Sequence, residues 1–255
     1  MISFRSLPSL ALLAACAGET KATGTCPTES IAYTDDGLMF TTLKEAVDTV
    51  SPGAVIRVCP GEFVIAYTAV YGRDFDDEVS VAGAGDETTL SGGNRNEVLA
   101  MISPSASVRI SDLTITSGYR DPREYCGDVD SSLSCPRTIA GTGLGVGGTH
   151  GQAEGVTITN NEALYGAGIQ ISPDSTLTIR NSRVTNNRAT YQGGAAVIQE
   201  GGVLVSENTT WEGNTPDDII FATIDDDPGN VVVHASWNAD GATDFTCRFD
   251  TLTCE

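Results

Sequence analysis

The sequence predicts an all-β solenoid of stacked parallel strands, and three observations lead to this prediction. A short apolar strand, two asparagines and a glycine cluster occur twice, as VTITNN before GAGI and as SRVTNN before GGAAV. Equivalent residues are 26 positions apart, both from Asn160 to Asn186 and from Gly168 to Gly194. Elsewhere, short runs of Val, Ile and Leu alternate with polar residues, as in strands that bury one face. A fixed period of strand-like units is typical of coiled parallel strands.

The first expected element is a short amphipathic helix over residues 42–50. Thr42 and Glu45 have the spacing of a capping box, and an apolar stripe follows at i, i+3, i+4 and i+7. The stripe consists of Leu43, Ala46, Val47 and Val50. The first coil of a solenoid exposes its core and its unpaired strand edges. We therefore expect this helix to lie across the first coil as a cap.

The strands follow in a regular order. They are expected at 54–59, 79–82, 88–90, 98–102, 108–110, 113–115, 156–159, 177–179, 182–185, 203–205 and 209–211. One interval is longer than the others, because Ile115 and Ile158 are 43 residues apart, 17 more than one period. The polar segment 119–137 holds the excess and is expected to be a loop inserted at one corner. The length of the coil region divided by the period gives about six coils.

Two further features complete the expected domain: glycine and asparagine at its corners, and an acidic segment that begins near residue 214. Glycine supplies the positive φ of sharp corners, and asparagine tolerates left-handed backbone and bonds its equivalent in the next coil. We therefore interpret Asn161, Asn187 and Asn214 as a structural ladder. Residues 214–255, which are acidic and contain Cys247 and Cys254 near their end, are expected to form a C-terminal cap. Residues 30–255 then make one elongated domain.

The N-terminus predicts export. Arg5 and the apolar stretch of residues 7–15 have the character of a signal peptide and are too short to span a bilayer. Leu13-Ala14-Ala15-Cys16 resembles a bacterial lipobox, which implies removal of residues 1–15, lipidation of Cys16 and a tether over 16–29. Because Ala17 and not aspartate follows Cys16, the resemblance implies the outer membrane or cell surface of a Gram-negative bacterium. The lipid anchor would then be the only membrane contact.

The cysteine count agrees with export. Seven cysteines are present, and lipidation of Cys16 leaves six, an even number in an oxidising compartment. Proximity favours the pairs Cys126–Cys135 and Cys247–Cys254, which leaves Cys26–Cys59, although six cysteines allow fifteen connectivities. The spacings do not match those of zinc ligands.

The formal net charge is −20, with 34 acidic and 14 basic residues. Nucleic acid and anionic lipid require clustered cationic side chains, so both are excluded as partners. Divalent cations and neutral or cationic ligands remain compatible with this charge.

Two segments resemble known proteins. The helix, the next strand and the run Pro60-Gly61-Glu62-Phe63 resemble the opening module of right-handed parallel β-helix proteins of the pectin-lyase-like superfamily. The asparagine-glycine repeat of residues 155–197 is similar to that of polymorphic outer-membrane proteins and related bacterial β-helix surface proteins. The resemblance covers most of 30–235 and implies a right-handed parallel β-helix. This superfamily includes lyases, hydrolases, esterases, phage tailspikes and surface proteins, so the resemblance implies no single reaction.

Catalytic candidates are few. A lyase of this fold needs calcium-binding acids and a basic residue on a flat strand face. Arg180, Arg183 and Arg188 fall on one coil and are the candidates, two of them expected in one solvent-facing row, but matching acids on adjacent coils are missing.

A hydrolase requires two carboxylates that act together across the scissile bond. Asp217 and Asp218 are adjacent, so on extended backbone they point to opposite faces and form no such pair. His150 and His234 are expected to be a loop residue and a strand-surface residue.

A calcium site is the remaining site hypothesis. Asn238, Asp240 and Asp244, with Gly241 between them, resemble an acidic loop in which oxygen ligands at alternate positions hold a hard cation. The terminal bidentate glutamate and other ligands of such a loop are missing. No other cofactor is expected.

The sequence therefore predicts a right-handed parallel β-helix of about six coils, with an N-terminal capping helix and a disulfide-closed C-terminal cap. The favoured function is non-enzymatic: a monomeric surface lipoprotein that presents a flat face to a polysaccharide or another extended ligand. A carbohydrate-active lyase or hydrolase with an atypical site is the alternative, and an adhesin is the second alternative.

Overall fold

The computed structural model describes residues 26, 29–51, 53–71, 78–103, 107–119, 142–148, 150–224 and 231–255. Several expectations lie outside these residues: the signal peptide, lipidation at Cys16, most of the tether, and nearly all of the 119–137 loop with its Cys126–Cys135 bridge.

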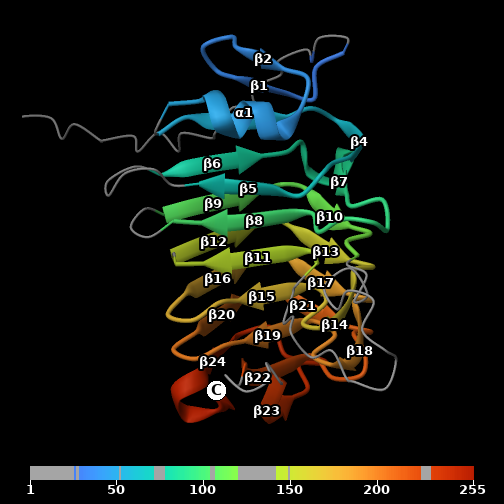
Figure 1. The fold of residues 1–255 in the computed structure, drawn as a ribbon, viewed down its shortest axis with the longest axis vertical. Coiled ribbons are helices and arrows are strands. Elements are labelled where there is room, and N and C mark those ends of the chain that lie inside the picture. The colour runs from blue at the N-terminus through green and yellow to red at the C-terminus, as the bar shows by residue number, and fades with distance from the viewer. Residues whose placement is uncertain are drawn as a thin grey trace, which may run out of the picture.

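The fold is a parallel β-solenoid whose walls are three sheets (Figure 1). The first sheet, sheet A, has the strand order β2 (Met39–Phe40), β1 (Ala32–Thr34), β3 (Val55–Val58), β6 (Val79–Ala82), β9 (Ser107–Ser111), β12 (His150–Glu154), β16 (Thr176–Arg180), β20 (Val203–Glu207), β24 (Phe245–Arg248) and β25 (Thr253–Cys254). Sheet B has the order β21 (Thr210–Glu212), β17 (Arg183–Thr185), β13 (Thr157–Thr159), β10 (Thr114–Thr116), β7 (Thr88–Ser91) and β4 (Gly61–Val64).

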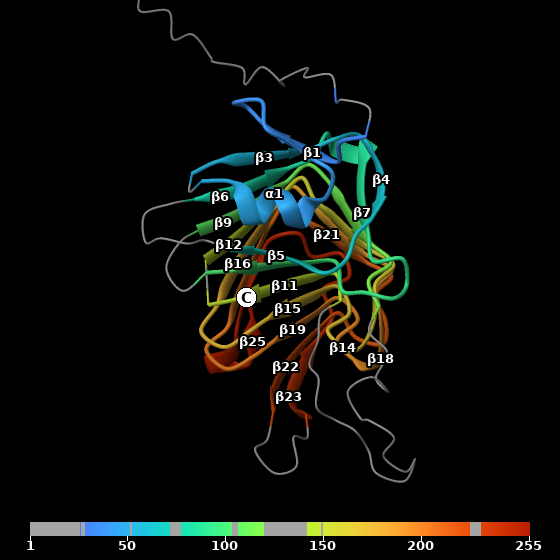
Figure 2. The same ribbon diagram turned by 45° about the horizontal axis from the view of Figure 1, so that its top comes forward.

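Sheet C forms the third wall (Figure 2). Its order is β23 (Val231–Trp237), β22 (Ile219–Ile224), β19 (Ala196–Ile198), β15 (Ile169–Ile171), β11 (Leu144–Gly147), β8 (Leu99–Ile102) and β5 (Thr68–Tyr71). A two-stranded sheet of β14 (Glu162–Tyr165) and β18 (Arg188–Gln192) adds to two neighbouring coils. Short 3-10 turns lie at η1 (Gly85–Glu87) and η2 (Phe249–Thr251).

The strands stack in about five turns, slightly fewer than the six expected. Antiparallel strands close both ends of the parallel stack. At the first coil β1 runs antiparallel to β3, and at the last coil β24 runs antiparallel to β20 while β23 runs antiparallel to β22.

The core is a continuous column of apolar side chains, as the alternating pattern predicts. In sheet B the aligned inward residues are Leu90, Ile115, Ile158, Val184 and Trp211, each at most 1% exposed. Each coil adds one layer to this column, so the hydrophobic effect holds consecutive coils together as well as the sheets of each coil.

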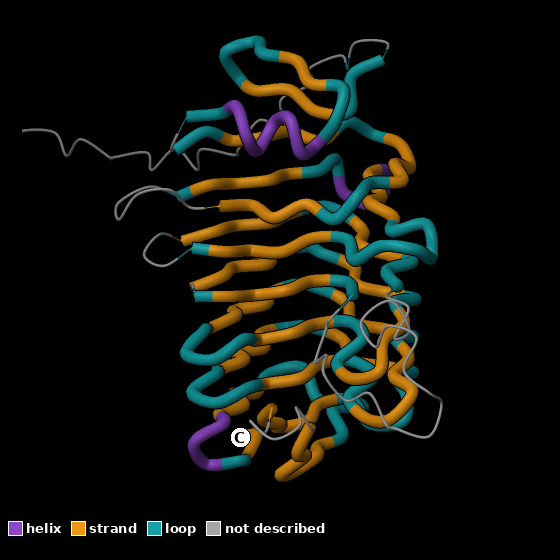
Figure 3. The backbone as a smooth tube through the Cα atoms, viewed as in Figure 1, coloured by secondary structure: helices purple, strands orange, loops and turns teal. Residues whose placement is uncertain are grey.

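Helix α1 (Leu43–Thr49) covers the first coil, which confirms the predicted cap (Figure 3). The hydroxyl of Thr42 accepts a hydrogen bond from the Glu45 amide at 3.1 Å. The Glu45 carboxylate accepts from the amide of Thr41, so the capping box closes one residue earlier than the standard pattern. A disulfide joins Cys26 to Cys59 beside this cap.

The C-terminal cap closes the other end. Trp211, Phe245 and Trp237 form an aromatic group there, with Trp211 and Phe245 ring centroids 5.4 Å apart and those of Trp237 and Phe245 4.7 Å apart. A disulfide joins Cys247 to Cys254 on the adjacent strands β24 and β25, as predicted.

The asparagine ladder is present at the corner that follows sheet B. Nδ2 of Asn161 donates to Oδ1 of Asn187 at 2.9 Å, and Nδ2 of Asn187 donates to Oδ1 of Asn214 at 3.0 Å. All three side chains are buried. The preceding residues Asn160 and Asn186 have φ values of 55° and 56°. The two asparagines of each repeat thus have separate roles, the first in the left-handed turn and the second in the ladder.

Candidate binding face and polar depression

The outer surface of sheet B carries two parallel columns of hydroxyl side chains. Strand register aligns Thr89, Thr114 and Thr157 in one column, and Ser91, Thr116, Thr159 and Thr185 in the other. We call the partly exposed threonines of these columns the hydroxyl face, which consists of Thr89, Thr114, Thr116, Thr157, Thr159 and Thr185. Neighbouring strands lie about 4.8 Å apart, so polar groups repeat along the solenoid axis at that spacing.

The hydroxyl face has this composition because each sheet B strand is short and reads polar-apolar-polar. In β10, β13 and β17 the central residue is buried and the flanking residues point outward. Threonine suits such positions, since its β-branched side chain packs well on a pleated surface. The hydroxyls also contact along the axis, where Oγ1 of Thr185 donates to Oγ1 of Thr159 at 3.3 Å.

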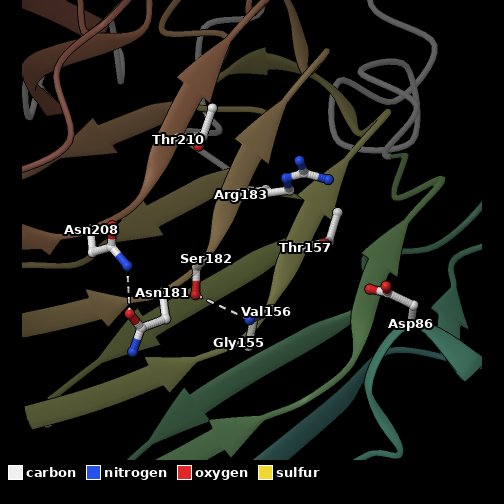
Figure 4. A pocket seen from close by; sticks show the side chains of 9 residues that line it. All are labelled: Asp86, Gly155, Val156, Thr157, Asn181, Ser182, Arg183, Asn208 and Thr210. Atoms are coloured by element: carbon white, nitrogen blue, oxygen red, sulfur yellow. Dashed lines mark hydrogen bonds between the residues drawn. The ribbon is translucent and has the colours of Figure 1, made fainter.

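A shallow polar depression of about 420 Å³ adjoins the hydroxyl face at the corner between sheets A and B (Figure 4). Its lining is Asp86, Gly155, Val156, Thr157, Asn181, Ser182, Arg183, Asn208 and Thr210. The corner positions Gly155, Asn181 and Asn208 all have positive φ. A side chain at position 155 would meet the Asp112 carboxylate, because an ideal Cβ there lies 3.1 Å from Oδ1 of Asp112.

Several lining groups are already used by the scaffold. Ser182 donates to the Arg180 carbonyl at 2.6 Å and accepts from the Val156 amide at 3.0 Å. Nδ2 of Asn208 donates to Oδ1 of Asn181 at 2.8 Å. Among the residues described, Arg183 has no ion pair. Its guanidinium extends beyond β17 in Figure 4, with Thr157 and Thr210 on the neighbouring strands. The depression therefore offers an unpaired cation among hydroxyls, with the Asp86 carboxylate on another side.

The structure does not bring Arg180, Arg183 and Arg188 together, so the expectation that two of them share one row is wrong. They lie on β16, β17 and β18, which belong to three different sheets, because the chain turns a corner between each pair. Arg180 is bound at two points by Glu207, with Nε to Oε2 at 2.6 Å and Nη2 to Oε1 at 3.1 Å. This hydrogen bonding lowers the pKa of Glu207 and raises that of Arg180.

Two of the three candidate side chains of the expected calcium loop, Asn238 and Asp244, form hydrogen bonds within the protein, and Asp240 is exposed. Oδ1 of Asp244 accepts from the Asn208 amide at 2.9 Å and Oδ2 accepts from the Thr243 hydroxyl at 2.7 Å. The hydrogen bond from Thr243, followed by that from Asn208, lowers the pKa of Asp244. Asn238 accepts from the Asp240 amide at 2.8 Å. Within the described ranges, no three His, Cys, Asp or Glu side chains are arranged to hold a metal ion.

The remaining candidates are separated from one another. Asp218 is buried and Asp217 is partly exposed, as expected for adjacent residues on extended backbone. His234 is exposed on β23, as expected, whereas His150 begins strand β12 instead of lying in a loop.

The depression was not predicted from the sequence. The 26-residue repeat could have indicated the threonine columns, because it places Thr159 and Thr185 at equivalent positions of consecutive coils.

No protein-family model matches the chain, and neither a curated protein nor a solved structure is significantly similar to it. The class of protein is therefore defined by the structure: an all-β parallel β-solenoid with a helical N-terminal cap and a disulfide-closed C-terminal end. In the part of the chain that the structure describes, no helix is both long enough and apolar enough to span a membrane.

Proposed function

We propose that this protein is an exported, non-enzymatic binding module whose hydroxyl face holds an extended neutral polysaccharide. We further propose that Cys16 anchors it by lipid to the outer membrane or cell surface of a Gram-negative bacterium. The observation that carries the binding proposal is the hydroxyl face, a set of aligned threonines that continues into the Arg183 depression.

The regular spacing of the face supports an extended ligand. Polar groups that repeat along the solenoid axis match a chain molecule that presents hydroxyls at intervals, whereas a compact ligand would contact only one or two coils. Threonine hydroxyls both donate and accept hydrogen bonds, as sugar hydroxyls do. The depression would hold the ligand at one defined position along this face. There Arg183 supplies a cationic donor and Asp86 an anionic acceptor.

Charge argues against an acidic polysaccharide. The chain carries a formal charge of −20, so a polyanion would be repelled before it reached the face. The same repulsion argues against acidic polysaccharides as substrates.

The absence of a catalytic pair in the depression supports a non-enzymatic role. Asp86 is the only carboxylate among its lining residues, and the paired acids of a hydrolase would require a second one. Elsewhere on the outer surface, Arg180 is occupied by Glu207 and Arg109 by Glu154, so neither arginine is free to act as a base. Arg183 is unpaired, but Asp86 is the one acid that lines the depression with it, whereas a lyase of this fold needs a set of calcium-binding acids.

The test is a panel of neutral and acidic polysaccharides applied to purified protein spanning residues 17–255, with and without calcium. Both retention of the protein and release of reducing or unsaturated ends are measured. We expect retention by a neutral polysaccharide, independent of calcium and without products. Product release would establish the carbohydrate-active alternative, and retention only by acidic polysaccharides would contradict the charge argument.

A further inference from the structure

Strand β23 is the terminal strand of sheet C and pairs on only one side in the described structure. Its partner is β22, to which it runs antiparallel from Ile219 and Trp237 to Ile224 and Val231. Figure 1 shows it at the lower end of the stack, below β22. An edge of this kind presents backbone N–H and C=O groups that can pair with another chain.

The burial of β23 agrees with an open edge. None of its seven residues is fully buried, and exposed residues alternate with partly buried ones along the strand. The first four residues of β22, one strand further in, are all buried. Val232 is 40% exposed and Ile224 is 47% exposed at the same end of the hairpin. A further strand beside β23 would therefore bury apolar surface as well as satisfy backbone groups.

The other ends of sheets A, B and C lack this character. In sheet A both terminal strands have two residues, and β25 is tied to β24 by the Cys247–Cys254 disulfide. In sheet B the terminal strands have three and four residues. At the opposite end of sheet C, α1 packs against β5. Short strands and covering helices are the usual protection of sheet edges. Strand β23 is long, rich in valine, and contains no Lys, Pro or Gly.

Charge around this edge selects the partner. Residues 217–224 and 231–255 contain six acidic residues and one cation, Arg248. Asp218 is buried and Asp244 bonds to Asn208 at the far corner, whereas Asp240, Asp250 and Glu255 are exposed. Asp240 comes three residues after β23, and Asp250 follows Phe249, whose ring contacts His234 of β23 at 5.7 Å between centroids. Strand β25, which precedes Glu255, lies close to β23. A second copy of the chain would bring like charges together at this end, which opposes self-association. A segment rich in Lys and Arg would be attracted.

We propose that β23 accepts a positively charged, extended segment of a partner protein as an added strand. The backbone edge of β23 supplies the hydrogen bonds, its partly exposed valines contact alternate apolar side chains, and the acidic surroundings favour the cationic ones. This site lies at the end of the solenoid and does not depend on the polysaccharide proposal.

The experiment measures binding of a short fluorescent peptide of alternating lysine and valine to the purified protein by anisotropy. Two further peptides serve as probes: one with glutamate in place of lysine, and one with alternate backbone nitrogens methylated. The protein variants are Ser236→Lys, which adds a cation to an exposed position of β23, and Thr190→Lys, which adds the same charge to an exposed position of β18.

The expected result is binding of the lysine peptide, weakened about tenfold or more by N-methylation and by Ser236→Lys, and unchanged by Thr190→Lys. The glutamate peptide should not bind. The methylated peptide tests strand addition without any change to the protein, so a folding defect cannot imitate its effect. Equal binding of the methylated and unmethylated peptides would overturn the proposal, as would no binding of the lysine peptide or equal weakening by both variants.

Discussion

Asn214 donates a hydrogen bond from Nδ2 to Oδ1 of Asp218 over 2.9 Å, so the asparagine ladder ends on a buried carboxylate. The other oxygen, Oδ2, accepts from the amide of Ala239 at 2.7 Å. Since Ala239 lies in the C-terminal cap, one acidic side chain connects the ladder of the coils to the cap. Desolvation raises the pKa of Asp218, against the opposing effect of these hydrogen bonds.

Asn187, in the middle of the ladder, should be the most sensitive of the corner asparagines. Its side chain accepts from the backbone amide and Nδ2 of Asn161, and donates to the Ile158 carbonyl and to Asn214. We expect Asn187→Ala to lower the free energy of unfolding by about 3 kcal/mol, because several buried polar groups lose their partners. Urea unfolding measures this change. The control, Thr185→Ala on the same coil, should change it by less than about 0.5 kcal/mol, and equal effects of the two substitutions would refute the ladder.

Asp218→Asn should change how stability depends on pH. The pKa of Asp218 is raised in the folded state, so the folded protein still holds the proton at pH values where the unfolded chain has lost it. Its stabilising contribution is complete below the unfolded pKa of about 3.9 and is lost as pH rises through the folded pKa. The stability of the wild type relative to Asp218→Asn should therefore fall as pH rises above about 4. Urea unfolding at a series of pH values measures this difference, and one that is constant or rises with pH would contradict the assignment.

The two disulfides that the structure describes should contribute unequally to stability. Cys26–Cys59 has a sequence separation of 33 residues and Cys247–Cys254 one of 7. The chain-entropy relation gives about 4 kcal/mol for the longer loop and about 2.5 kcal/mol for the shorter. Urea unfolding of the two paired Cys→Ala variants measures both values. A larger loss from the C-terminal pair would show that effects other than loop closure dominate.

Cys16→Ser should release the protein from the membrane. A lipidated cysteine places several acyl chains in the bilayer, which gives stable anchoring, and serine cannot carry the thioether-linked lipid. Expression in a Gram-negative host, with fatty-acid labelling and membrane fractionation, measures the effect. We expect the label and the membrane fraction to be lost together; persistent labelling of the Cys16→Ser variant would exclude Cys16 as the lipid site.

The repeat made the fold largely predictable. The period between Asn160 and Asn186 depends on local requirements, a left-handed corner and an inward strand residue, and these recur in every coil. The capping helix was equally local, since Thr42 and Glu45 are close in sequence. The C-terminal boundary was less predictable. Residues 214–255 were expected to form the cap, but β22 pairs in parallel with β19 as a coil strand, and only β23 is antiparallel to it.

The candidate site was predicted less well, for a geometrical reason. Arg180 and Arg183 are three residues apart, yet the corner at Asn181 sends their side chains to different sheets. Conversely, Asp86 and Arg183 line one depression although almost a hundred residues separate them. In a solenoid, the register between coils decides which residues lie close together. That register is known only when the position of every corner is known.

The central claim is that the hydroxyl face binds a polysaccharide, and one matched pair of substitutions tests it most directly. Thr159→Trp places a bulky side chain in the centre of the face, whereas Thr178→Trp places the same side chain on the outer surface of sheet A. Affinity electrophoresis in gels containing the neutral polysaccharide that retains the wild type measures both. We predict that Thr159→Trp weakens retention about tenfold or more while Thr178→Trp leaves it unchanged. Wild-type retention of Thr159→Trp, or equal loss in both variants, would contradict the proposed face.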